Sequence, residues 1–150
     1  MRMHRIEVLI VDDQAIVREG VKRILAGAPE VQVVGEAASG SEATRLMRSG
    51  HWDVILLDMS LPDTDGLGIL RAIHDFDPRS PVLVLGLYAE DQAALSLLKA
   101  GARGYLEKQD APTELVPAIH RVAEGGHYIG TALAERLSRD IAAPGEYRAR

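Results

Sequence analysis

The chain has 150 residues, 47% of them hydrophobic and 26% charged, with a formal net charge of −5. This length fits one domain, which would bury roughly two thirds of the surface that its unfolded chain exposes. The absence of cysteine excludes disulfides, thiolate metal sites and a cysteine nucleophile, and the negative net charge argues against direct binding of nucleic acid.

Apolar runs alternate with amphipathic segments along most of the chain. Strands are predicted at 6–11, 31–37, 53–58, 81–87 and 103–107, and helices at 14–27, 40–49, 65–75, 90–100 and 113–125. Three glycines follow helix ends, as left-handed caps do: Gly27, Gly50 and Gly101. Strands that alternate with helices predict a parallel sheet covered on both faces.

The segment after residue 126 differs from the rest. Leu133, Leu137 and Ile141 repeat every four residues and predict a short sixth helix, which Pro144-Gly145 would end. We therefore expect a main domain at 1–126, a linker helix at 127–143 and a disordered tail at 144–150.

No stretch approaches the roughly 20 apolar residues of a membrane span. The N-terminal segment also lacks a signal-peptide pattern, because its apolar stretch is short and contains Glu7. We expect a cytoplasmic protein with no membrane partner.

Charged residues close three of the predicted strands. Asp12 and Asp13 end the first, Asp58 ends the third and Lys108 follows the fifth. The carboxyl ends of parallel strands meet at one crevice, where such sheets bind ligands. Crowded carboxylates raise one another's pKa unless a cation is present, and a divalent ion with oxygen ligands supplies one. A carboxylate beside such an ion is a suitable phosphoryl acceptor.

Each of these residues also has a plainer interpretation. Asp58 could belong to a turn, Asp12 and Asp13 could cap the first helix, and Lys108 could be solvated. We favour a shared site because uncompensated carboxylates in one crevice destabilise a fold and are rarely present without a use. The remaining nearby acids are interpreted as loop or rim charges rather than ligands: Asp63, Asp65 and Glu107.

Three motifs in this order resemble a response-regulator receiver domain over about residues 5–125: Val11-Asp12-Asp13, the turn 57–62, and Gly104 to Lys108. The run 99–106, and Gln109 after Lys108 in place of proline, are similar to regulators of the LuxR/NarL (FixJ) type. The resemblance implies a flavodoxin-like, doubly wound sheet of five strands in the order 2-1-3-4-5, with five flanking helices.

The resemblance also implies the role of each site residue. Asp58 would be the phosphoacceptor, and Lys108 would pair with it and then with the phosphoryl oxygens. Mg²⁺ would be held by Asp12, Asp13, Asp58 and the backbone carbonyl of Ser60. The domain would catalyse only its own phosphorylation and dephosphorylation, so it is not expected to be an enzyme acting on a separate substrate.

The partners follow from the same family. The phosphoryl donor would be a phosphohistidine on a sensor histidine kinase, and the output would be homodimerisation that controls transcription. DNA would be contacted only through a helix-turn-helix effector domain, which we expect the full-length protein to carry beyond residue 150.

One position departs from the family pattern. Gly86 stands where such receivers have Ser or Thr, whose hydroxyl binds a phosphoryl oxygen and lets a switch aromatic, here Tyr105, turn inward. The missing hydrogen bond would contribute about 1.5–3 kcal/mol to the phosphorylated state. Moving a two-state equilibrium from mostly inactive to mostly active takes about 5.5 kcal/mol, so its loss could remove a sizeable part of the switch. A backbone N–H or water could replace it, the domain could act independently of phosphorylation, or Gly86 could be an introduced substitution. We also expect the loop 86–90 to be mobile.

Three other functions compete with a phosphorylated receiver. A metal-dependent phosphohydrolase would need a second acid two residues after the nucleophile, where Ser60 stands. A nucleotide-binding domain would need a glycine-rich turn where the chain has Asp12-Asp13-Gln14. A receiver that serves purely as a phosphorylation-independent interaction module is favoured by Gly86.

Overall fold

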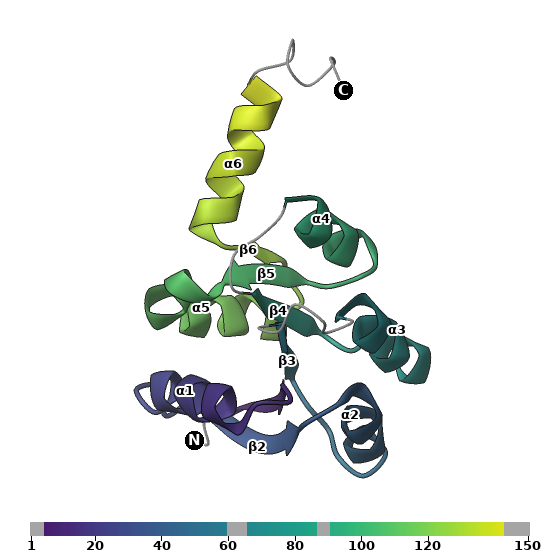
Figure 1. Cartoon of the computed structure of the whole chain (residues 1–150). Coiled ribbons are helices and arrows are strands. Elements are labelled where there is room, and N and C mark those ends of the chain that lie inside the picture. The colour runs from purple at the N-terminus through teal and green to yellow at the C-terminus, as the bar shows by residue number, and fades with distance from the viewer. Residues whose placement is uncertain (1–4, 60–65, 87–90, 143–150) are drawn as a thin grey trace.

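A parallel sheet of six strands in the order β2-β1-β3-β4-β5-β6 forms the centre of the fold (Figure 1). The computed structural model describes residues 5–59, 66–86 and 91–142. The strands are β1 (Ile6–Val11), β2 (Val31–Ala37), β3 (Val54–Met59), β4 (Val82–Gly86), β5 (Gly104–Glu107) and β6 (Tyr128–Ile129). The helices are α1 (Ala15–Leu25), α2 (Gly40–Met47), α3 (Gly66–Phe76), α4 (Asp91–Lys99), α5 (Ala111–Ala123) and α6 (Thr131–Ala142), with a 3₁₀ turn η1 (Lys108–Asp110) between β5 and α5.

Helices cover both faces of the sheet, and successive strand residues point to opposite faces. In β1, Val8 and Ile10 pack with α1 and α5, whereas Leu9 and Val11 pack with α2, α3 and α4. Figure 1 shows these two groups of helices on opposite sides of the strands. Because both faces are buried, the central strands are continuous apolar runs, which explains why the sequence predicted them well.

The predicted flavodoxin-like fold and the order of the first five strands are confirmed. The sixth helix is also confirmed as α6. The prediction of a five-stranded sheet was short by one strand, because Tyr128 and Ile129 pair with Gly104 and Tyr105 of β5. Two residues are too few to give a periodic pattern, and the predicted linker helix at 127–143 includes them. The expected tail at 144–150 lies outside the described residues.

The predicted helix caps were right at one glycine of three. Gly101 has a φ of 113°, whereas Gly27 and Gly50 are not left-handed. Gly125, with a φ of 90° after α5, is a left-handed residue that the cap prediction missed. Helix α1 instead has Ala26 as its C-cap, in a right-handed conformation, and the Ala26 N–H donates to the carbonyl of Lys22.

Across residues 5–59, 66–86 and 91–142, no helix combines the length and the apolar content needed to cross a bilayer.

Candidate functional site

Strands β1 and β3 bring two buried aspartates to the carboxyl edge of the sheet. Val11 of β1 is in register with Leu57 of β3, so the next residues, Asp12 and Asp58, stand opposite each other. Asp12 is 4% exposed and Asp58 is 2% exposed. Carboxylates this well buried are uncommon unless they are paired or bind an ion.

Lys108 supplies positive charge from the end of β5. Its Nζ lies 3.1 Å from Oδ1 of Asp58, and its side chain is 22% exposed. The contact is an ion pair rather than an aligned hydrogen bond, since both Asp58 oxygens are buried without a hydrogen-bond partner among the described residues. The predicted meeting of residues from β1, β3 and β5 is therefore present.

The surroundings of the two aspartates oppose their ionisation. Burial raises the pKa of Asp58 to about 6, Lys108 counteracts this, and Asp12 raises the pKa further. Burial also raises the pKa of Asp12, against a hydrogen bond from the Gln14 N–H, and Asp13 adds to the increase. Lys108 lowers both pKa values, yet one ammonium does not offset burial and mutual repulsion.

Of the two remaining predicted metal ligands, only Asp13 belongs to the described residues. Asp13 is exposed and follows Asp12 directly, while Ser60 lies outside the described residues. Asp63 and Asp65, which were expected to be loop or rim charges, also lie outside them. Within the described ranges, no three acidic or histidine side chains form a metal cluster.

The donor chemistry nevertheless fits Mg²⁺. This ion takes oxygen ligands, and it usually binds through one or two carboxylates while keeping several waters. Among the described residues, the two buried Asp58 oxygens have no hydrogen-bond partner, so they are available as ligands of this kind. The neighbouring Asp12 carboxylate adds negative charge.

The departure at Gly86 has a direct structural counterpart in Tyr105. The Tyr105 side chain is buried, and a Cβ atom added to Gly86 would lie 2.4 Å from its Oη and 3.1 Å from its Cζ. Tyr105 thus occupies the space that any larger residue at position 86 would need. The expected mobility of the loop 86–90 concerns residues 87–90, which lie outside the described residues.

Glu107 was wrongly interpreted as a rim charge. It is 1% exposed, and its Oε2 pairs with Nη2 of Arg136 on α6 at 2.5 Å. Arg136 stands three residues after the buried Leu133, so both lie on the helix face that contacts the domain. That spacing was visible in the sequence, but the partner of the face was not.

Known proteins share this fold and this sequence pattern. Residues 8–120 match the family model of the response regulator receiver domain. A crystal structure of a LuxR-family two-component response regulator from Aurantimonas sp. SI85-9A1 is 33% identical, with a TM-score of 0.84, over 92% of this chain and 99% of that one. The signal receiver domain of the putative response regulator NarL from Mycobacterium tuberculosis is 34% identical, with a TM-score of 0.72, over 81% and 98%.

Curated relatives are longer than this chain. The response regulator UvrY of Escherichia coli is 38% identical over 89% of this chain and 61% of its own length. GacA of Pseudomonas aeruginosa is also 38% identical, over 89% and 62%. The chain spans about three fifths of the length of these relatives. With the matched motif at the carboxyl edge of the sheet, the chain belongs to the response regulator receiver domain family, in its LuxR/NarL branch.

Proposed function

We propose that this domain receives a phosphoryl group on Asp58 from the phosphohistidine of a sensor histidine kinase, in a Mg²⁺-dependent reaction. The observation that carries the proposal is the buried Asp58 carboxylate, which faces Lys108 and has no hydrogen-bond partner among the described residues. With its pKa raised to about 6 by burial, Asp58 is mainly ionised near pH 7.5 and is available as a nucleophile.

The transfer needs positioning more than covalent chemistry from the protein. An Asp58 oxygen forms a bond to phosphorus while the P–N bond of the phosphohistidine breaks, and the released imidazole takes a proton from solvent. Lys108 stabilises negative charge on the phosphoryl oxygens. Bound Mg²⁺, held by Asp12, Asp13, Asp58 and the Ser60 carbonyl, would neutralise charge between acceptor and phosphoryl group. Attack of water on phosphorus later breaks the bond between phosphorus and the Asp58 oxygen, which releases inorganic phosphate and restores the free carboxylate.

The output follows the regulators that this domain resembles. We propose that the cytoplasmic full-length protein forms a homodimer when phosphorylated, and that it controls transcription through a DNA-binding effector domain. The chain itself is a signalling domain, and its net charge of −5 makes direct contact with DNA unfavourable.

A second candidate is a receiver that acts through phosphorylation-independent protein contacts. The packing of Tyr105 over Gly86 favours it, because the aromatic side chain is already buried without a hydroxyl at position 86 to signal through. In this case Asp58 would still contribute charge to the crevice but would not be modified.

Intact mass spectrometry after incubation with acetyl phosphate or phosphoramidate and Mg²⁺ tests the first candidate. We expect one added phosphoryl group, which is absent in Asp58→Asn and in the presence of EDTA. Asp75→Asn, which changes an exposed aspartate on α3, should be modified like the native chain. No adduct with either donor would reject phosphorylation and favour the second candidate.

A further inference from the structure

The N-terminus of α6 is held by acidic residues that follow β5. Oε1 of Glu114 on α5 accepts hydrogen bonds from Oη of Tyr128 at 2.7 Å and from the N–H of Thr131 at 3.2 Å. Burial and the Glu114 charge raise the pKa of Asp110, against a hydrogen bond from the Ala132 N–H. Two carboxylates therefore bind first-turn N–H groups of α6, where negative charge stabilises a helix.

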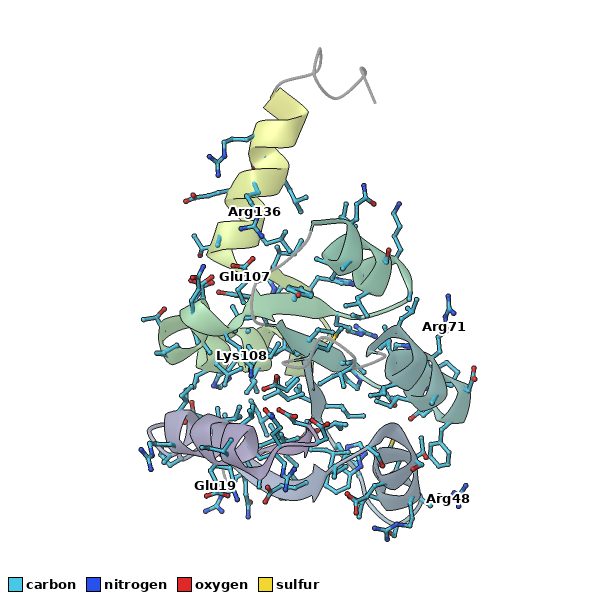
Figure 2. All side chains as sticks on the ribbon, in the orientation of Figure 1. Glu19, Arg48, Arg71, Glu107, Lys108 and Arg136 are labelled. Carbon is cyan, nitrogen blue, oxygen red and sulfur yellow. The ribbon has the colours of Figure 1, made fainter. Side chains whose placement is uncertain are left out.

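A second set of contacts fastens the next turns of α6. Arg136 pairs with the buried Glu107, and Figure 2 shows its side chain reaching down from α6 toward that residue. Leu133 is fully buried in the same apolar cluster as Tyr105 and Leu97. The first half of α6 is thus part of the domain, although the remainder projects beyond the sheet (Figure 1).

The turn η1 joins these contacts to the Asp58 site. Its first residue, Lys108, pairs with Asp58. Its second residue, Gln109, donates from Nε2 to Oε1 of Glu107 at 3.1 Å, and its third, Asp110, binds the start of α6. A single 3₁₀ turn of three residues therefore carries both the lysine that pairs with Asp58 and the aspartate that holds the start of α6.

We propose that the occupancy of Asp58 and the docking of α6 are energetically coupled through η1. The inference rests on the proposed phosphorylation of Asp58 and adds the element that reports it. A phosphoryl group on Asp58 redirects Lys108 to new oxygens, and the Asp110 contact with α6 changes with it. The inward turn of a switch aromatic, which the family resemblance implies, contributes little here, because Tyr105 is already buried over Gly86.

Hydrogen exchange of the whole chain measures this coupling. With Mg²⁺ and beryllofluoride as the phosphoryl mimic, the amides of residues 131–137 should change their exchange rate by about fivefold or more, the lower end of typical allosteric coupling. Protection of the peptide 54–59 reports in the same experiment whether the mimic is bound.

Asp110→Asn separates coupling from a merely structural role for the contact. Coupling is reciprocal, so this variant should lose most of the exchange response of α6 and also alter the affinity of Asp58 for beryllofluoride by a similar factor. A structural contact would loosen α6 and leave that affinity unchanged. Glu135→Gln, which removes a charge from an exposed position on α6, is the matched control and should behave like the native chain.

The coupling and the phosphoacceptor proposal fail in different ways. Protection at 54–59 without a response at 131–137 overturns the coupling and leaves the phosphoacceptor proposal intact. An unchanged affinity of Asp110→Asn for beryllofluoride has the same meaning. Absence of protection at 54–59, together with no adduct from acetyl phosphate, rejects the phosphoacceptor proposal and the coupling that rests on it.

Discussion

At the scale of single residues, Asp58 lies in surroundings that oppose the ionisation of its carboxyl group. It is buried opposite another buried aspartate, and the partly exposed Lys108 is its counter-charge among the described residues. An ordinary stabilising aspartate has its pKa lowered by its partners, whereas the pKa of Asp58 is raised, first by burial. Ionised Asp58 therefore opposes folding, and this is typical of a residue retained for chemistry.

Asp58→Asn should accordingly stabilise the apo protein at neutral pH. The folded pKa is raised from 3.8 to about 6, so ionisation costs about 3 kcal/mol of folding free energy above pH 6 and nothing below pH 4. The native chain loses this stability as the pH rises between those values. Urea unfolding in EDTA at a series of pH values should show the advantage of the variant shrinking toward pH 4. An advantage that is independent of pH would contradict this origin.

Gly86→Ala should displace Tyr105. The added Cβ would meet Oη at 2.4 Å, so the ring must leave its buried position, and we expect about 1–3 kcal/mol of destabilisation. In the double variant with Tyr105→Phe, the hydroxyl oxygen is absent and part of the loss should be recovered. Urea unfolding of the four variants of this double-mutant cycle measures the coupling. Additive effects would show that the two positions do not interact.

At the scale of elements, the sequence predicted what packing on both faces dictates. The continuous apolar runs located β1, β3 and β4, and the stripe of leucines located α6. Strand β6 was not predicted, because hydrogen bonds to residues distant in sequence determine its position. The Tyr128 N–H donates to the Arg103 carbonyl at 3.0 Å, and the Gly130 N–H donates to the Tyr105 carbonyl at 2.8 Å. Such tertiary hydrogen bonds leave no periodic trace in the chain.

Leu133→Ala tests whether α6 folds together with the sheet. Its fully buried side chain predicts a loss of about 2–5 kcal/mol in the free energy of unfolding. Fluorescence of Trp52, whose ring lies beside Gly35 of β2 at the sheet edge opposite β6, should report the loss if the two parts unfold as one unit. Leu137→Ala, at a half-buried position on the same helix face, should cost less. An unchanged Trp52 transition would mean that α6 unfolds separately.

At the scale of the whole molecule, the site was predictable because the fold was. The apolar runs that precede Asp12 and Asp58 form adjacent parallel strands, and the register of these strands places the two aspartates opposite each other. The burial and pairing of Glu107 could not be predicted in this way. That assignment depends on where α6 packs against the domain, and this position is fixed by contacts with β5 and α5.

Magnesium should stabilise the whole domain in a pH-dependent manner. At one hundred times its dissociation constant, an ion that binds only the folded chain adds about 2.7 kcal/mol. The increase in Tm, measured by scanning calorimetry at pH 7.5, should diminish at pH 5, because burial raises the pKa values of Asp58 and Asp12 and favours their protonation. Asp58→Asn should remove most of the increase, and an equal increase in that variant would place the ion elsewhere.

The short strand β6 has a consequence for shortened forms of this chain. It pairs with Gly104 and Tyr105, the first two residues of β5, a strand whose residues are all buried. A fragment cut after α5 would leave the carbonyls and amides of this pairing open along an apolar rim. Open sheet rims recruit further chains by edge-to-edge pairing, so such a fragment should self-associate and precipitate even though it retains the entire Asp58 pocket.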